Sequence, residues 1–303
     1  MTTTAELMNR LAPSVGLNDT PLNGVRIYKA TQSSPRSPLL YTQGIIIVGQ
    51  GKKRVFLGET AYEYTPDRYL VMSVPIPAEC EAPATEEEPF LAMLIDINLA
   101  HVSTVIGKMG DHLPPFADTG DTNRGLFLAE ADAPFKETTA RLLRALTSPM
   151  ETEVLGDALL KELFFRVMCG DNAASLYALA VKNTHLSRID KVLKQIHSHY
   201  HRPMDVDQLA GLVNMSPSAF HRAFKEVTAS SPIQYIKKVR LNKARDLLVL
   251  SGARVNEAAT RVGYESPTQF SREFKRYFGE SPVAFSNQAA RATASQAGAA
   301  PRL

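Results

Sequence analysis

Two arginines and two lysines recur at one spacing in the C-terminal third of this chain. Arg222 and Lys225 lie three residues apart, and Arg272 and Lys275 repeat that pair 50 positions later. A guanidinium group can form a bidentate hydrogen-bonded pair with guanine, and a lysine ammonium group can pair with a phosphate. Side chains of these types at a repeated spacing indicate two similar places at which the region binds a polyanion.

The repeat extends beyond the basic residues. Residues 213–235 and 263–285 share eight of 23 aligned positions, which are Ser216/Ser266, Pro217/Pro267, Phe220/Phe270, Arg222/Arg272, Phe224/Phe274, Lys225/Lys275, Ser231/Ser281 and Pro232/Pro282. Serine followed by proline is typical of an N-cap and the first helical position, so each copy predicts a helix that begins at its proline. Because phenylalanines four residues apart share one helix face, we expect them in the core and not in base stacking.

A short apolar segment precedes each predicted helix, at residues 206–213 and 256–262. Helix, tight turn, helix is the arrangement with which DNA-binding proteins place a second helix in the major groove. Between the copies, residues 232–250 predict a long helix that holds the two motifs at a fixed separation. Its N-cap would be Ser231, and its apolar face would comprise Ile233, Ile236, Val239, Leu241, Ala244, Leu247 and Leu248.

At these motifs the chain strongly resembles the C-terminal domain of the AraC/XylS family of bacterial transcription regulators. The matching sequences are Leu209-Ala210, S-x-x-x-F-x-R-x-F-K at 216–225, VRLNKARDLL at 239–248 and VGYESPTQFSREFKRYFGESPVAF at 262–285. One departure is Ala229, because the family usually has glycine at this position. The second copy has that glycine, Gly279. The resemblance implies a regulator, most simply an activator, that binds double-stranded DNA as a homodimer and has RNA polymerase as a partner.

The resemblance also assigns roles to individual residues. The positions that match the family's base-reading residues are Ser218, His221, Arg222, Thr268, Gln269 and Arg272. Arginine suits guanine, glutamine suits adenine, and a threonine methyl can meet that of thymine. Phosphate contacts position the protein on DNA without specifying a sequence. The residues suited to such contacts are Ser216, Lys225, Arg240, Ser266 and Lys275. The alternative for each arginine is a surface ion pair.

Charge is divided unevenly along the 303 residues. The net charge of +3 comprises +7 in residues 188–288, −6 in residues 1–187 and +2 in the remaining tail. No apolar run approaches membrane-spanning length and the start lacks the order of a signal peptide, so we expect a cytoplasmic protein with no membrane partner. Two cysteines without CxxC spacing predict neither a disulfide framework nor a zinc knuckle.

The N-terminal half alternates short β-rich runs with turns and then becomes helical. Strands are predicted at residues 25–29, 39–41, 45–48, 54–57, 61–64, 69–74 and 90–97, and helices at 99–109, 135–146, 154–168 and 173–181. This part resembles the cupin-like regulatory domain of one AraC subfamily. The expected fold class is therefore α+β with two domains: a cupin-like β-barrel with flanking helices, and an all-α domain with two helix-turn-helix motifs joined by a long helix.

Four segments follow from these patterns. We expect an effector-binding or dimerisation domain at 1–181, a linker at the polar segment 182–187, the DNA-binding domain at 188–288 and a disordered tail at 289–303. The triplet His197, His199 and His201 could suggest a metal site, but alternate residues spread around a helix axis, so a polar surface is expected instead.

A small effector is the expected regulator of the barrel. Candidate lining residues are Gln43, Tyr62, Tyr64 and Cys80, with Glu79 as a further polar side chain. Cys80 could sense oxidants or electrophiles, or could be a buried, inert thiol. The alternatives are a barrel that only dimerises, and a metal-dependent cupin enzyme. The enzyme alternative lacks ligands because no histidine precedes His101, so neither a metal nor another cofactor is expected.

Overall fold

The computed structural model describes residues 2–112, 125–170, 173–181 and 184–287, which form two compact units. The first consists mainly of residues before Lys191 and the second mainly of those from Lys191 onward. The tail predicted to be disordered, 289–303, lies outside the described residues. The predicted linker, 182–187, lies partly outside them, and its residues 185–187 already belong to helix α6 (His185–His199). Leu186 in that segment is fully buried, which explains why helix replaces the expected irregular chain.

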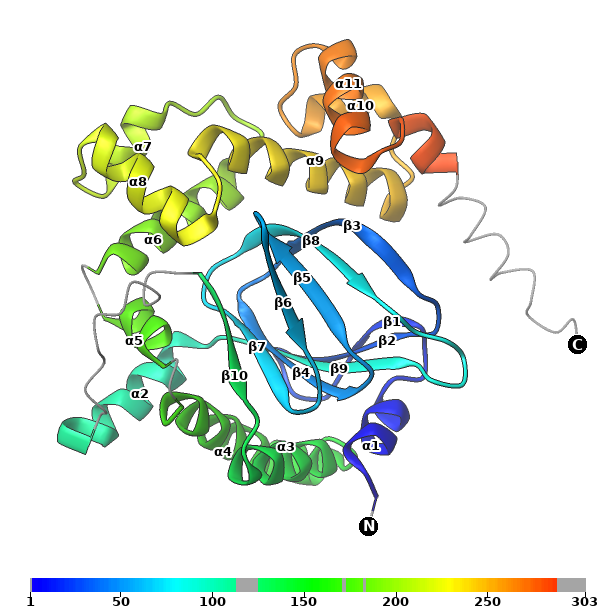
Figure 1. The fold of residues 1–303 in the computed structure, drawn as a ribbon, viewed down its shortest axis with the longest axis vertical. Helices are drawn as coiled ribbons and strands as arrows, with labels where there is room; N and C mark the ends of the chain where they lie inside the picture. Colours follow the sequence, from blue (N-terminus) through cyan, green and yellow to red (C-terminus); the bar gives the residue numbers. More distant parts are fainter. Residues whose placement is uncertain (1, 113–124, 171–172, 182–183, 288–303) are drawn as a thin grey trace, which may run out of the picture. The chain divides into compact units, whose positions relative to one another are not determined.

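Two antiparallel sheets build the N-terminal unit (Figure 1). The larger has the strand order β1-β2-β9-β4-β7-β10, with bounds Gly16–Asp19, Val25–Ala30, Phe90–Asp96, Gly44–Gln50, Arg68–Met72 and Leu126–Glu130. The smaller has the order β3-β8-β5-β6, with bounds Ser34–Tyr41, Ile76–Ala82, Lys53–Leu57 and Thr60–Tyr64. The two sheets face each other, as the cupin-like barrel prediction requires.

Alternation along the strands separates the two faces of the larger sheet. Ile45 and Ile47 of β4 are buried on the face that carries α1 (Thr4–Leu11), and Gly49 on that face leaves room only for Met8 of α1. On the same unit, α3 (Ala133–Ala145) stacks Phe135 on Tyr69 with ring centroids 4.1 Å apart. The other face of the sheet is turned toward the smaller sheet.

The remaining helices of this unit are α2 (Leu99–Met109), a 3-10 turn at Gly110–His112, α4 (Pro149–Met168) and α5 (Ala174–Ala180). The predicted helices were therefore confirmed, but α1, β1, β8 and β10 were not expected from the sequence patterns. Strand β8, IPAECEA, combines a proline with two glutamates, residues that are uncommon in strands. Its glutamates face outward, where they pair with arginines of neighbouring strands.

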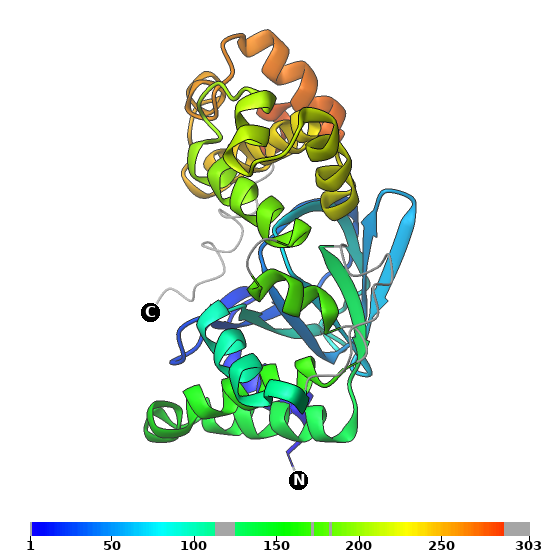
Figure 2. The ribbon, with the colours of Figure 1, turned by 90° about the vertical axis from the view of Figure 1, so that its left-hand side faces the viewer.

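The C-terminal unit is helical: it contains α6, α7 (Val206–Leu212), α8 (Pro217–Thr228), α9 (Pro232–Leu250), α10 (Val255–Arg261) and α11 (Pro267–Phe278), and the chain is helical again at 282–287. Figures 1 and 2 show α7 and α8 near one end of α9, and α10 and α11 near the other. The repeated phenylalanines Phe220, Phe224, Phe270 and Phe274 are all fully buried, as predicted. Ile233, which we expected on the buried face of α9, is 53% exposed, and Tyr235 and Asn242 are buried instead.

The two helix-turn-helix motifs differ by one residue in the turn. Met215 and Tyr264 donate equivalent backbone hydrogen bonds, to Ala210 and Ala259, so positions before the turn correspond at a spacing of 49. From Ser216/Ser266 onward the spacing is 50. The sequence alignment used a constant spacing of 50 residues, and it was therefore wrong for the positions before Ser216 and Ser266. The turn of the second motif carries one additional residue.

The two recognition helices also end differently. Ala229 after α8 has φ 52° and Gly279 after α11 has φ 83°, so both lie in the left-handed region. A Cβ atom is strained there, whereas glycine is not. We expect Ala229→Gly to raise the free energy of unfolding by up to about 1 kcal/mol, because the relieved strain exceeds the entropy cost of glycine.

The reciprocal variant is the matched control. A Cβ at position 279 meets no atom within 4 Å, so Gly279→Ala introduces backbone strain without a clash. It should lower the free energy of unfolding by about 1 kcal/mol. Urea denaturation followed by circular dichroism measures both changes, and a loss of stability in Ala229→Gly would contradict the strain assignment.

Candidate functional site

Helix α8 presents its polar predicted residues to solvent. Ser218, His221, Arg222 and Lys225 are exposed and follow one another at the three- and four-residue spacing of a single helix face. Ser216 caps the helix, since its hydroxyl accepts a hydrogen bond from the backbone N–H of Ala219 at 3.4 Å. The structure thus brings together on α8 all the predicted side chains of the first motif.

Helix α11 repeats this arrangement with different side chains. Thr268, Gln269, Arg272 and Lys275 are exposed on one face, opposite the buried Phe270 and Phe274. Ser266 accepts a hydrogen bond from the N–H of Gln269 at 3.3 Å and so caps the helix as predicted. Both recognition helices therefore combine a polar, partly basic outer face with an exposed N-terminal turn, where backbone N–H groups favour phosphate.

The second motif contains a polar network that sequence reasoning missed. Glu273 is 9% exposed, and its carboxylate accepts hydrogen bonds from Tyr264, Lys237 and Gln269 at 2.8, 3.0 and 3.2 Å. Burial alone raises the pKa of Glu273, but these three donors outweigh burial and hold the pKa below its usual range. The spacing of four between Gln269 and Glu273 was the available sequence signal.

This network constrains the amide of Gln269. One N–H of its Nε2 is engaged by Glu273, which leaves the other N–H and the Oε1 acceptor for a partner. A donor and an acceptor side by side are what adenine requires in the major groove. The first motif has alanine at both corresponding positions, Ala219 and Ala223, so it contains no equivalent network.

Arg240 does not lie where we expected it. Its guanidinium donates to the backbone carbonyls of Tyr200, Arg202 and Gly263 at 2.7, 2.8 and 3.2 Å. These bonds tie α9 to the chain after α6 and to the turn of the second motif. Gly263 has no room for a Cβ, which would lie 2.3 Å from the carbonyl oxygen of His201. The structure therefore gives Arg240 a structural role in place of the predicted phosphate contact.

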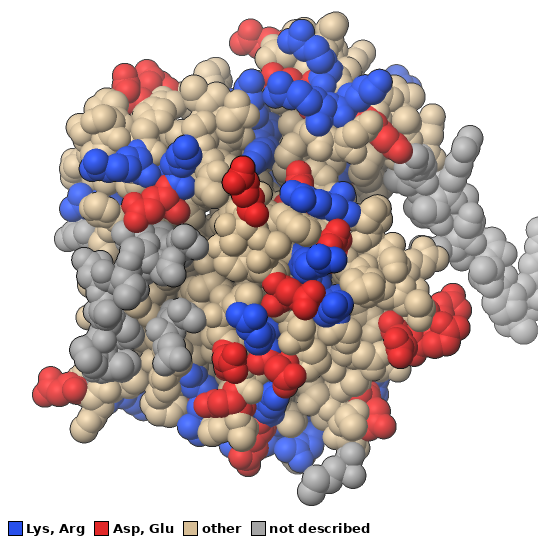
Figure 3. Space-filling view, viewed as in Figure 1, with Lys and Arg blue, Asp and Glu red and all other residues tan. Residues whose placement is uncertain are grey.

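The two predicted base-reading arginines have no acidic partner in the described part of the chain. Neither Arg222 nor Arg272 forms an ion pair with another described residue, whereas Arg261 pairs with Glu257 nearby. Figure 3 shows lysine and arginine side chains gathered over α9 to α11, with a second group over α7 and α8. The surface ion-pair alternative is thus not what the structure contains at these positions.

The interior of the barrel brings together two of the predicted effector residues. Tyr64 of β6 and Tyr41 of β3 are buried with their hydroxyl oxygens 3.2 Å apart, and Cys80 of β8 interacts with Tyr41 through its side chain. Burial raises the pKa of Tyr41 well above its ordinary value, and the nearby Tyr64 and Cys80 add to this increase. Cys80 is 5% exposed, which agrees with a buried thiol.

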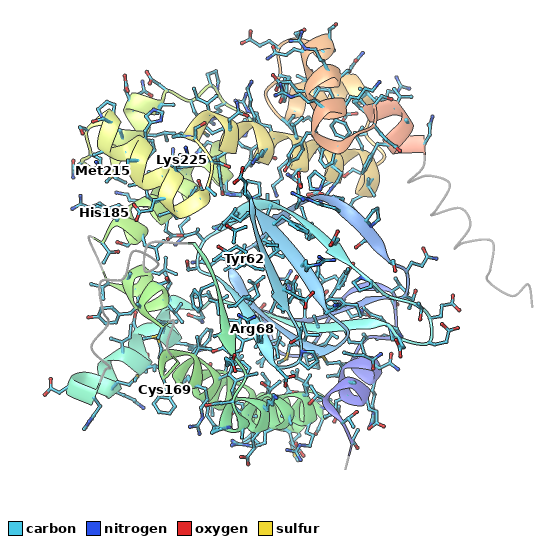
Figure 4. All side chains as sticks on the ribbon, in the orientation of Figure 1. Tyr62, Arg68, Cys169, His185, Met215 and Lys225 are labelled. Carbon is cyan, nitrogen blue, oxygen red and sulfur yellow. The ribbon has the colours of Figure 1, made fainter. Side chains whose placement is uncertain are left out.

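The other predicted polar residues divide between the two faces. Tyr62 lies on β6 (Figure 4) and is paired with Val55, so it shares the inner face with Tyr64. Gln43 donates from Nε2 to the carbonyl of Ser73 at 2.7 Å and is engaged in holding strand ends together. Glu79 faces outward and pairs with Arg36, so it cannot line the interior.

Lys53 is a further inner residue that sequence reasoning missed, as it missed Tyr28 and Tyr41. It is paired with Tyr64 across β5 and β6, and its Nζ lies 5.6 and 5.5 Å from the ring centroids of Tyr28 and Tyr41. Tyr28 belongs to β2 of the opposite sheet, so Lys53 points across the barrel. In the sequence, Lys53 stands in a run of three basic residues and only the strand register separates it from its outward neighbours.

No metal site appears in the described residues, where no group of three or more histidine, cysteine or acidic side chains could hold an ion. His197 is half-buried, since its Nε2 lies 2.8 Å from the hydroxyl of Tyr235, and burial lowers its pKa to about 4. It is therefore a packing residue and not the polar surface residue we expected. Within the described ranges, no helix has the length and apolar character to cross a membrane.

Comparisons with known proteins match both units. Residues 21–175 match the family model described as the AraC-type transcriptional regulator N-terminus, and residues 209–288 match the helix-turn-helix domain model. The chain is 35% identical over 100 residues to the HTH-type transcriptional regulator AlkR of Acinetobacter baylyi, which covers 33% of each chain. It is 34% identical over 96 residues to the activator RhaS of Escherichia coli, covering 32% of this chain and 34% of RhaS.

These curated relatives therefore share about a third of their length with the chain. A solved structure extends the similarity to both units. An apo crystal structure of a ToxT variant from Vibrio cholerae aligns with a TM-score of 0.60 over 87% of this chain and 97% of ToxT, at 10% identity, which shows a shared fold. The β-sheet unit matches the model of the AraC-type regulator N-terminus over half of the chain, and two helix-turn-helix motifs follow it. This protein therefore belongs to the AraC-type transcriptional regulators, a family of DNA-binding proteins and not of enzymes.

Proposed function

We propose that this protein activates transcription as a homodimer whose two helix-turn-helix motifs read different sequences and whose barrel binds a small effector. In this proposal Ser218, His221 and Arg222 read bases from α8, and Thr268, Gln269 and Arg272 read bases from α11. Lys225, Lys275 and the caps at Ser216 and Ser266 bind phosphates. Arg240 holds the fold and is left out of the interface. The proposed domain bounds remain 1–181 and 188–288.

One observation carries the DNA-reading part of this proposal. On each recognition helix the arginine is exposed, has no acidic partner among the described residues, and lies on the same face as the other assigned side chains. An unpaired guanidinium on the outer face of a second helix suits contact with guanine in the major groove. The two faces differ at Ser218/Thr268, Ala219/Gln269 and His221/Ser271, so the two motifs should prefer unequal base sequences in a fixed orientation.

Effector control rests on the barrel interior. Two buried tyrosine hydroxyls, a thiol and a lysine lie between the two sheets. A barrel that serves only to dimerise does not require polar groups in its interior. Buried polar groups are costly unless each has a partner, so natural proteins that retain several of them commonly use them for recognition. A barrel that only dimerises is the second candidate, and it is favoured if no small molecule changes operator binding.

Selection of random DNA with the purified full-length protein tests the proposal. We expect one enriched motif made of two unequal elements about one helical turn apart. A promoter that carries this motif upstream should be transcribed more strongly in cells that contain the protein. Absence of any enriched sequence would overturn the DNA-reading assignments, and unchanged or reduced transcription would overturn the role as an activator.

A further inference from the structure

Lys53 is a half-buried cation without an acidic partner in the described part of the chain. Its neighbours on β5 and the preceding turn face outward and are paired, Lys52 with Glu63 and Arg54 with Glu81. For Lys53 no ion pair with a carboxylate exists among the residues that the structure describes. A charge removed from water is unfavourable unless an opposite charge or hydrogen bonds compensate for it. Two tyrosine faces, at 5.6 and 5.5 Å, give only partial compensation.

The surroundings of Lys53 offer hydrogen bonds as well as charge. Tyr64, directly across from Lys53, and Tyr41 carry hydroxyl groups that lie 3.2 Å from each other. One of these hydroxyls donates to the other, and burial keeps both protonated by raising their pKa values. An anion at Lys53 would thus meet an ammonium group and at most one phenol O–H, since the other is used within the tyrosine pair.

Apolar surface remains accessible on the inner face of the larger sheet. Ile46 of β4 and Leu94 of β9 form a cross-strand pair there, and both are only half-buried. Their neighbours Ile45 and Ile95 face the helices and are 0% and 1% exposed. The inner pair therefore keeps apolar surface accessible that these outer neighbours bury. Arg26, paired with Leu94 on the same face, is held by Asp96 at 2.6 Å.

The opposite wall has small side chains. The inward positions of β8 are Ala78, Cys80 and Ala82, each 5% exposed, and Val55 is paired with Cys80. Small residues on one sheet opposite an accessible isoleucine and leucine on the other leave room for an apolar group. The inner faces of the two sheets thus carry one unpaired charge, Lys53, and one accessible apolar pair, Ile46 and Leu94.

We propose that the barrel binds an organic carboxylate with an apolar body, whose charge pairs with Lys53 and whose body lies against Ile46 and Leu94. The proposal rests on the effector function proposed above and specifies the chemical class of the effector. Sugars and other neutral polyols are excluded by it, because they would leave the lysine unpaired and would cover the apolar pair poorly.

Isothermal titration of the full-length protein with matched acids and amides tests this class. The probes are octanoate, 4-phenylbutanoate and the corresponding uncharged amides. At least one acid should bind with a dissociation constant below about 1 mM and at least tenfold more tightly than its amide. Lys53→Met removes the charge but keeps the apolar stem, and it should weaken acid binding about tenfold or more while leaving amide binding unchanged.

Lys52→Met is the control, since Lys52 is exposed and already paired with Glu63. It should bind the acids like the unmodified protein. Equal acid binding in Lys53→Met, or no acid binding by the unmodified protein, would overturn the proposal. Tight binding of the amides with no effect of Lys53→Met would reject the carboxylate class and yet leave effector control standing. Thermal unfolding of each variant verifies that the fold is retained.

Discussion

Replacing Arg240 with alanine is expected to lower the free energy of unfolding of the C-terminal unit by about 3 kcal/mol. The guanidinium of Arg240 donates to three backbone carbonyls that belong to two separate segments, and alanine removes all three charged hydrogen bonds. The freed carbonyls recover some solvation, so the loss is smaller than the sum of three such bonds. Hydrogen exchange of the α9, α10 and α11 amides in the full-length protein measures the change.

Arg261→Ala is the matched control for this experiment. Arg261 is exposed and forms a single ion pair with Glu257 one helical turn away, so its removal should change stability by less than about 0.5 kcal/mol. If Arg240→Ala left the exchange rates unchanged but reduced the salt dependence of DNA binding, Arg240 would be the phosphate contact that the sequence predicted.

Replacing Arg272 with alanine is expected to weaken operator binding by about 1–3 kcal/mol and to relax specificity at a single base pair. Arg272 is exposed on α11, has no acidic partner in the described residues, and lies three positions from Gln269. Its truncation removes a bidentate contact without disturbing the buried face of the helix. Competition binding against every single-base variant of the selected operator measures both effects.

Lys225→Ala distinguishes phosphate contact from base reading. Lys225 is exposed on α8, and its loss should weaken binding to all sequences alike and lower the slope of log affinity against log salt by about one. The specificity profile should stay the same in this variant. Unchanged specificity in both Arg222→Ala and Arg272→Ala would reject the assignment of these arginines to bases.

The sequence predicted the C-terminal unit well because its signals are local. Ser-Pro caps, phenylalanines spaced by four and the apolar face of α9 depend on nearby residues only, and the helices begin at Pro217, Pro232 and Pro267 as predicted. The sequence could not show which group each polar side chain hydrogen-bonds. Arg240 binds groups that are 23 or more residues away, and two of the three donors to Glu273, Tyr264 and Lys237, are nine and 36 residues away. Only the folded chain shows these contacts.

The sequence predicted seven of the strands of the N-terminal unit, β2 to β7 and β9, but not the interior between the sheets. Alternation identifies two faces of a strand, and only pairing decides which face is inside. The register of β5 with β6 places Lys53 beside Tyr64 and turns Arg54 outward, a distinction that three consecutive basic residues cannot reveal. For the same reason Glu79 was a candidate for the interior although it faces solvent.

The claim that each motif reads its own sequence is tested most directly by transferring the α11 side chains to α8. In a variant with Ser218→Thr, Ala219→Gln and His221→Ser, random-DNA selection with the full-length protein should give an altered first element that resembles the second, with the second element unchanged. A selected motif identical to that of the unmodified protein would contradict base reading by the exposed faces of α8 and α11.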